Sequence, residues 1–158
     1  MTDPEAPMTA PLRPARPADA DAVTRIVRAA YAPYIPRIGR EPGPMGDDYA
    51  ARIAAGQVQV LDDPALGVCG VLVLEPQADA MLLDNIALAP EAQGKGHGKR
   101  LMAAAEAAAR AAGFDRIRLY THEKMFENIA LYAALGYAET GRVQEKGFDR
   151  VYMEKPLG

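Results

Sequence analysis

Hydrophobic and polar residues in the first third of the chain follow helical spacing on both sides of a proline-rich stretch. Apolar side chains recur at three- and four-residue intervals over 20–30, which predicts a helix there. Residues 31–46 are dense in proline and glycine, and we interpret them as a loop long enough to serve as a binding loop or a lid. A second helix is predicted over 47–55, because Gly56 follows it as a C-terminal cap.

The apolar pattern then changes to the alternation and β-branched runs that are typical of strands. A polar break at 91–99 separates three of these strands from an alanine-rich helix. The predicted strands are 12–16, 57–61, 67–74, 80–88 and 115–120, followed by two strands around a turn at 146–147. The predicted helices of this half are 100–112 and 125–135, each followed by a glycine.

This order of elements predicts a single α/β or α+β domain with a mixed sheet. The chain has 158 residues, a length typical of one domain, and it contains no internal repeat. We place the domain at 11–158. The proline-interrupted residues 1–10 are expected to form a disordered tail.

Composition and charge argue against nucleic acids and membranes as binding partners. The chain is 49% hydrophobic and carries a net charge of −3, so no positive field favours nucleic acid or an anionic membrane surface. No apolar run approaches the roughly 20 residues that span a bilayer. The N-terminus lacks the basic and apolar stretches of a secretion signal, and the single cysteine, Cys69, has no disulfide partner within the chain. We therefore expect a cytoplasmic protein without nucleic-acid or membrane partners.

The segment after the strand at 80–88 contains the most informative residues. Glycines at 94, 96 and 98 allow backbone angles that other residues resist, and they let the chain approach a ligand closely. Their successive N–H groups, together with the start of the next helix, are suited to a phosphate-bearing ligand. The spacing matches neither a Walker loop nor the dinucleotide fingerprint. A merely flexible turn remains an alternative for this loop considered alone.

Two motifs together resemble a known family. Gln93, Gly96 and Gly98 fit the defining positions of the Gln/Arg-x-x-Gly-x-Gly/Ala signature of the GNAT N-acetyltransferase superfamily. Asn128 and Tyr132 lie on a predicted helix followed by Leu-Gly-Tyr, which looks like the second marker of that family. The resemblance covers nearly the whole domain. It implies a mixed, mostly antiparallel sheet of about seven strands with about four helices, splayed between the fourth and fifth strands.

The resemblance also implies acetyl-CoA as cosubstrate and no metal ion. Its pyrophosphate is expected on the backbone amides of the glycine loop, and its pantetheine arm beside the strand at 86–88. Asn128 is expected to hold that arm through its amide. The residues expected to contact acetyl-CoA are Ile86, Ala87, Leu88, Gln93, Gly94, Lys95, Gly96, His97, Gly98, Lys99 and Asn128.

Acetyl transfer to an amine requires a base that deprotonates the ammonium and an acid for the departing thiolate. Tyr132 is the candidate acid, because the resemblance assigns a tyrosine this role and because it shares a helix face with Asn128. An amphipathic core tyrosine is the structural alternative. Asp84 is the first candidate for the base, with Glu123 and His122 as alternatives. Direct attack is expected, since the chain shows no nucleophile motif for a covalent intermediate.

The proline-rich loop is expected to select the acceptor. Tyr31 and Tyr34 offer flat walls, and Asn85 adds a polar group beside the candidate base. Arg37 and Arg40 are candidates for binding a carboxylate or phosphate, which suggests a small anionic or zwitterionic amine. The alternative is that both arginines are solvated surface charges.

Three further alternatives are left open by the sequence. Two of them concern function: an acyl-CoA-binding sensor without turnover, and an acetyltransferase for protein termini or lysines. The hairpin over 143–154 is a candidate homodimer surface or a wall of the acceptor site, although edge strands often pair in crystals without biological meaning. The sequence does not distinguish transfer of an acetyl group from transfer of a slightly longer acyl group.

Overall fold

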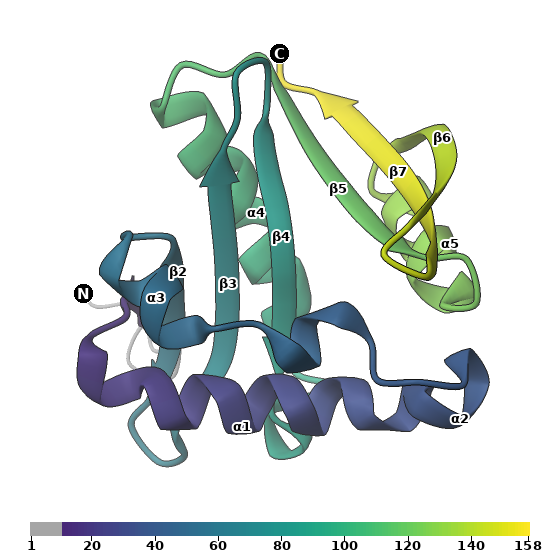
Figure 1. The fold of residues 1–158 in the computed structure, drawn as a ribbon. Helices are drawn as coiled ribbons and strands as arrows, with labels where there is room; N and C mark the ends of the chain where they lie inside the picture. The colour runs from purple at the N-terminus through teal and green to yellow at the C-terminus, as the bar shows by residue number, and fades with distance from the viewer. Residues whose placement is uncertain (1–10) are drawn as a thin grey trace.

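The computed structural model describes residues 11–158, and the tail expected at 1–10 lies outside the described residues (Figure 1). The strands are β1 (Leu12–Pro14), β2 (Val58–Asp63), β3 (Gly67–Pro76), β4 (Met81–Leu88), β5 (Arg116–His122), β6 (Ala138–Glu145) and β7 (Phe148–Pro156). The helices are α1 (Ala20–Tyr31), α2 (Ile35–Ile38), α3 (Tyr49–Ala54), α4 (His97–Ala111) and α5 (Phe126–Ala134).

All seven strands form one sheet in the order β1-β2-β3-β4-β5-β7-β6. Every neighbouring pair is antiparallel except β4 and β5, which run parallel and pair only from Met81–Ile117 to Leu83–Leu119. Beyond that point the two strands separate, as Figure 1 shows in the gap that widens between them. The prediction of a mixed, mostly antiparallel sheet splayed between its fourth and fifth strands is confirmed.

Helices cover both faces of the sheet, with α1 and α3 on one face and α4 on the other (Figure 1). The helical spacing of apolar residues explains the packing, because the buried side chains of each helix share one face. In α1 these side chains are Val23, Ile26 and Val27, and in α4 they are Leu101, Met102, Ala105 and Ala109. Cys69 on β3 is fully buried within the same core. No helix in residues 11–158 is long and apolar enough to cross a membrane.

The segment predicted as a loop at 31–46 is partly helical, so that prediction was wrong in detail. It contains 3-10 turns at Ala32–Tyr34 and Gly43–Gly46 on either side of the one-turn helix α2. Each of these pieces has proline at its first or second position, where the fixed φ of proline suits a helix start. The prolines therefore begin short helical turns as well as interrupting longer ones.

Helix α4 begins at His97, three residues before its predicted start. Gly96 is its N-cap and adopts a left-handed conformation with φ of 83°. Gly98 and Lys99 consequently lie in the first helical turn instead of in a loop. The first helical N–H groups therefore follow immediately after the glycine turn, where an anion is favoured.

A β-bulge interrupts β4 at Asp84. Asn85 pairs with Val73 of β3 and Leu83 pairs with Leu74, which leaves Asp84 without a partner across the ladder. A bulge bends the strand and redirects the side chains next to it. Consequently the side chains of both Asp84 and Asn85 contact α3, although consecutive residues of a regular strand face opposite sides.

Candidate active site

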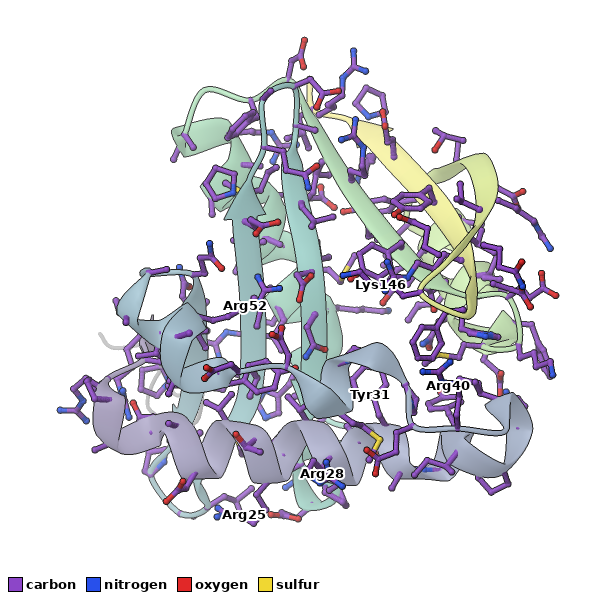
Figure 2. The ribbon with its side chains drawn as sticks, viewed as in Figure 1. Arg25, Arg28, Tyr31, Arg40, Arg52 and Lys146 are labelled. Atoms are coloured by element: carbon purple, nitrogen blue, oxygen red, sulfur yellow. The ribbon has the colours of Figure 1, made fainter. Side chains whose placement is uncertain are left out.

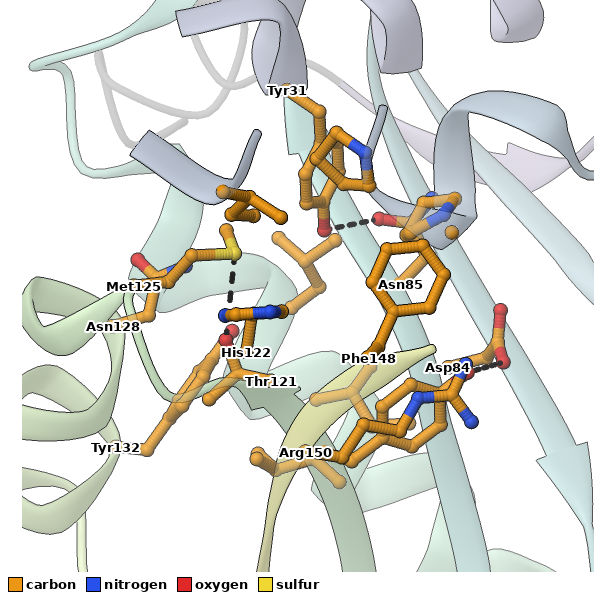
Figure 3. A pocket seen from close by; sticks show the side chains of 18 residues that line it. Tyr31, Asp84, Asn85, Thr121, His122, Met125, Asn128, Tyr132, Phe148 and Arg150 are labelled. Atoms are coloured by element: carbon orange, nitrogen blue, oxygen red, sulfur yellow. Dashed lines mark hydrogen bonds between the residues drawn. The ribbon is translucent and has the colours of Figure 1, made fainter. Parts of the chain in front are cut away.

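A pocket lies where β4 and β5 separate (Figure 3). Its walls come from the end of α1, the segment 42–44, β4, β5, the start of α5, and β7. Tyr31, Asp84, Asn85, Ile86, Asn128 and Tyr132 line it, which are six of the residues singled out in the sequence. The splayed sheet thus brings residues from distant parts of the chain to one cavity.

Asp84 is a buried carboxylate at the apex of the splay. Its side chain is 7% exposed, and Oδ1 lies 3.4 Å from Arg52 Nη2 of α3. The hydroxyl of Tyr120 on β5 donates a hydrogen bond to the same oxygen at 3.4 Å. Burial raises the pKa of Asp84, and the charge of Arg52 opposes this increase without cancelling it. A carboxylate with a raised pKa is a stronger base than an exposed one, which suits proton abstraction.

Asn85 of β4 connects the sheet to α1 and α3 beside the pocket. Its Oδ1 accepts a hydrogen bond of 2.8 Å from the Tyr31 hydroxyl, and its Nδ2 donates one of 2.9 Å to the Tyr49 hydroxyl. The Tyr49 hydroxyl in turn donates to the carbonyl of Pro44. With an exposed fraction of 3%, Asn85 has both ends of its amide bonded to protein. These bonds fix Tyr31 in the pocket wall (Figures 2 and 3).

Tyr132 and Asn128 enter the pocket from one face of α5. Four residues separate them, which is one helical turn. Burial raises the pKa of Tyr132 to about 12, so its hydroxyl is protonated at neutral pH. A protonated phenol inside the pocket can donate a proton to a leaving group.

His122 also lines the pocket (Figure 3). Burial lowers the pKa of His122, which keeps the imidazole neutral at neutral pH. The backbone N–H of Lys124 donates to Nδ1 at 3.1 Å, so the proton of the neutral ring is assigned to Nε2. His122 therefore remains an alternative to Asp84 as the base.

The glycine turn leads from β4 into α4. Gly94 and Gly96 have φ of 77° and 83°, values that favour glycine, whereas Gly98 is helical. The exposed residues of this turn include Gln93, Gly94, Lys95 and Gly96. Gln93 donates a side-chain hydrogen bond to the carbonyl of Leu88 at 3.3 Å, which ties the turn to the end of β4. The turn and the first amides of α4 form the kind of concave backbone surface that binds a phosphate.

The edge of β4 that faces β5 is unpaired from Asp84 to Leu88, because the parallel ladder ends at Leu83. Ile86, Ala87 and Leu88 all lie on this free stretch. An extended ligand with amide groups can pair with such an edge as an added strand does. The free edge connects the glycine turn with Asp84 and the pocket.

Four of the residues predicted to act in catalysis or acceptor binding do not line the pocket: Glu123, Tyr34, Arg37 and Arg40. Glu123 is exposed, and Tyr34 lies beside the ring of Tyr31 with centroids 6.5 Å apart. Arg37 pairs with Glu127 at 2.5 Å, and its guanidinium lies 4.7 Å from the Phe126 ring. This pair joins α2 to α5 across the pocket, since Ile38 of α2 and Met125 both line it.

Arg40 lies under the turn between β6 and β7, near Lys146 (Figure 2). Its guanidinium lies 4.3 Å from the centroid of the Phe148 ring. A Cβ added to Gly147 would stand 2.5 Å from its Nη1, so the arginine is packed against this turn. Arg37 and Arg40 therefore contact protein groups instead of pointing into the cavity.

Three residues of the site were missed in the sequence. Arg52 pairs with Asp84, Tyr120 donates to it, and Arg150 lines the pocket from β7. Arg52 sits on a short helix and Arg150 in a strand of alternating polarity, so neither belongs to a recognisable motif. Tyr120 had the strongest signal, because it ends the predicted strand 115–120, the fifth strand, at which the sheet was expected to splay.

Comparison with known proteins finds two curated relatives that match part of this chain. N-alpha-acetyltransferase 80 of Mus musculus is 39% identical over 72 residues, which are 46% of this chain and 22% of that protein. An IAA acetyltransferase of Azospirillum brasilense is 33% identical over 91 residues, 56% of this chain and 60% of that protein. The chain thus spans less than two thirds of either curated relative.

Among solved structures, a phosphinothricin acetyltransferase of the GNAT superfamily from Sinorhizobium meliloti, in complex with AcCoA, is 28% identical. The match has a TM-score of 0.71 and covers 96% of this chain and 90% of that one. The Acetyltransferase (GNAT) family model matches residues 26–137, which include β4, the glycine turn, Asn128 and Tyr132. The chain belongs to the GNAT acetyltransferase family.

Proposed function

We propose that this protein transfers the acetyl group of acetyl-CoA to the primary amine of a small molecule, by direct attack. The separation of β4 from β5 after Leu83 is the observation that supports this proposal most strongly. It leaves a free strand edge for an extended cosubstrate and opens a pocket with a carboxylate and a phenol in its wall. The relatives named above are acetyltransferases, and the solved one binds AcCoA.

In this mechanism the pyrophosphate of acetyl-CoA binds the amides of the glycine turn, and the pantetheine arm lies along the free edge of β4. Asn128 bonds to the arm from α5. The binding of a phosphate by the start of α4 follows from the partial positive charge of its N-terminus. Lys95 and Lys99 add two cationic side chains to this surface.

Asp84 accepts a proton from the ammonium of the acceptor, directly or through water. The neutral nitrogen attacks the acetyl carbonyl, and a backbone N–H of the free β4 edge stabilises the oxyanion. As the tetrahedral intermediate collapses, the attacking nitrogen loses its second proton to solvent, the carbon–sulfur bond breaks, and Tyr132 donates its proton to the thiolate. Proton exchange with solvent then restores Asp84 to its carboxylate and Tyr132 to its phenol.

A protein N-terminus is the second candidate acceptor, because the mouse relative is named an N-alpha-acetyltransferase. The lining of the pocket favours a small-molecule amine over a protein N-terminus as the acceptor. Segment 42–44 and Ile38 form one wall of the pocket, and the Arg37–Glu127 pair holds α2 against α5 beside it. A polypeptide would require this segment to move aside.

The test is continuous measurement of thiol release from acetyl-CoA, with a panel of small amines compared with peptides that have free N-termini. Release with one or more small amines, and none with peptides, supports the proposal. Release only with peptides contradicts the choice of acceptor. Absence of release in a protein that binds CoA by calorimetry contradicts catalysis and favours a sensor of acyl-CoA.

A further inference from the structure

Arg150 is a largely buried cation in the wall of the pocket. It lies on β7, where it pairs with His122 of β5 and Val143 of β6. Its side chain is 13% exposed, and it lines the same cavity as Asp84 (Figure 3). A guanidinium is costly to bury without a partner, so its partners decide what it does there.

Two aromatic rings lie close to this guanidinium. Its Cζ lies 4.4 Å from the centroid of the Tyr120 ring and 5.9 Å from that of Phe148. A Cβ added to Gly43 would stand 3.7 Å from Nη2, so the backbone of the segment 42–44 approaches closely. Stacking of this kind holds the plane of the guanidinium, and its several N–H donors point outward in that plane. Tyr152 is one of their partners.

The only ion pair of Arg150 within residues 11–158 is weak. Its Nη1 lies 3.8 Å from Glu145 Oε1, which is too long for a hydrogen bond. That oxygen already accepts a hydrogen bond from the Tyr152 hydroxyl. Arg118, the comparably buried arginine of β5, instead has Asp79 at 2.7 Å and Glu154 at 2.8 Å.

We propose that Arg150 binds a carboxylate of the acceptor, and that the acceptor is an amino acid or another small amine bearing a carboxylate. The proposal rests on the proposed function, because the pocket receives an acceptor only if the splay holds acetyl-CoA. Tyr120 separates the two charges of the site, with its hydroxyl on Asp84 and its ring under Arg150. A zwitterion matches this order, with its ammonium toward Asp84 and its carboxylate toward Arg150.

This assignment replaces the two arginines favoured by the sequence pattern. Arg37 is bonded to Glu127 and Arg40 is stacked on Phe148, and neither lines the cavity, whereas Arg150 does. A planar guanidinium also forms two parallel hydrogen bonds to a carboxylate, which lysine does not. The arginine therefore selects for the shape of the anion as well as for its charge.

The experiment compares α-amino acids with their carboxamides, which keep the amine and lose the negative charge. In the wild type we expect kcat/KM to be about 10- to 100-fold higher for the acid, the effect of one hydrogen-bonded charge pair. Arg150→Gln is expected to abolish this preference by lowering the value for the acid far more than the value for the carboxamide. Arg150→Lys is expected to retain part of it. Arg142→Gln, at an exposed arginine of β6 paired with Glu139, is the matched control and should behave as the wild type.

Thermal denaturation of each variant shows whether it folds. A wild type without preference for acids, or an Arg150→Gln variant that loses acid and carboxamide equally while remaining folded, overturns the proposal. Loss of the preference in Arg37→Gln instead of Arg150→Gln overturns it as well.

Failure of the proposed function can be distinguished from failure of the proposed carboxylate site. If no amine releases thiol, calorimetry with the same amino acids in the presence of CoA tests Arg150 directly. Binding by the wild type that Arg150→Gln loses supports the carboxylate site. Absence of amino-acid binding to the wild type contradicts it.

Discussion

The guanidinium of Arg52 on α3 lies 3.4 Å from the carboxylate of Asp84 on β4. This contact exists because the bulge in β4 turns Asp84 toward α3 at the point where β4 leaves β5. Arg52 is itself held by Asp47 at 2.7 Å and by Gln57 at 2.9 Å. The candidate base is therefore fixed in place by a chain of contacts that begins outside the pocket.

Replacement of the base should change both the rate and its dependence on pH. Asp84→Asn is expected to lower kcat/KM by about 100- to 10,000-fold, the usual contribution of a general base. In the wild type kcat/KM should rise with pH through the raised pKa of Asp84, and the variant should lose this limb. A pH–rate profile for both proteins measures this. An unchanged limb in Asp84→Asn would assign it to another group, such as His122.

The same carboxylate should affect stability in a defined direction. Its pKa in the folded protein lies above the usual value of 3.8, because burial disfavours the charged form. The folded state therefore binds this proton more tightly than the unfolded state, and the contribution to stability is lost as the pH rises through the folded pKa. Relative to Asp84→Asn, the wild type should become less stable between pH 3.8 and neutrality. Urea denaturation at several pH values measures the difference, and the opposite slope would contradict the raised pKa.

Removal of the phenol of Tyr132 should slow the chemical step and leave binding intact. Tyr132→Phe is expected to lower kcat by about 100-fold or more, the low end for a general acid, with KM for acetyl-CoA unchanged. Tyr137→Phe is the matched control. It loses a buried hydroxyl that donates to Glu106 at 3.3 Å, and it lies outside the pocket lining. An equal loss of kcat in both variants would identify a structural effect.

Replacement by alanine should have opposite effects on stability at two glycines of the glycine turn. Gly96→Ala places a Cβ at φ of 83° and should destabilise the fold by about 1–2 kcal/mol. Gly98 is helical, and a Cβ there would meet Leu88 at an ordinary 3.9 Å, so Gly98→Ala should stabilise the helix by up to about 1 kcal/mol. Both should raise KM for acetyl-CoA if the turn binds its pyrophosphate. If KM rises only in the destabilised Gly96→Ala variant and not in Gly98→Ala, the turn is only structural.

The Asn85 amide should contribute chiefly to stability. Asn85→Leu leaves the Tyr31 and Tyr49 hydroxyls without this partner, and each lost bond costs about 1–3 kcal/mol when its group is buried. Tyr31→Phe removes one of these bonds together with its donor and should cost less. The two variants should be non-additive in a double-mutant cycle, because they share a bond. Additive denaturation free energies would mean that the bond contributes nothing.

The motifs and the order of elements could be predicted from the sequence because each depends on local signals. Apolar periodicity indicates α1 and α4, and the spacing of Gln93, Gly96 and Gly98 indicates the phosphate turn. The resemblance to the GNAT superfamily predicted the splay that frees the edge of β4, and it placed Tyr132 near the cosubstrate. These inferences required no knowledge of which side chains meet in space.

The acceptor side could not be predicted in the same way. Arg37 and Arg150 are both arginines near aromatic residues in the sequence, and only folding decides that Glu127 binds one while the other lines the cavity. The bulge at Asp84 depends on the register between β3 and β4, which no single strand contains. Long-range pairing therefore sets which residues line the pocket.

The most direct test of acetyl transfer by this pocket is detection of the acetylated amine by mass spectrometry, together with the amount of free thiol released from acetyl-CoA. We predict one acetylated amine for each thiol with the wild type, and loss of both products in Asp84→Asn and Tyr132→Phe variants that remain folded and bind CoA. Thiol release without acetylated amine, or unchanged product from both variants, would contradict the mechanism.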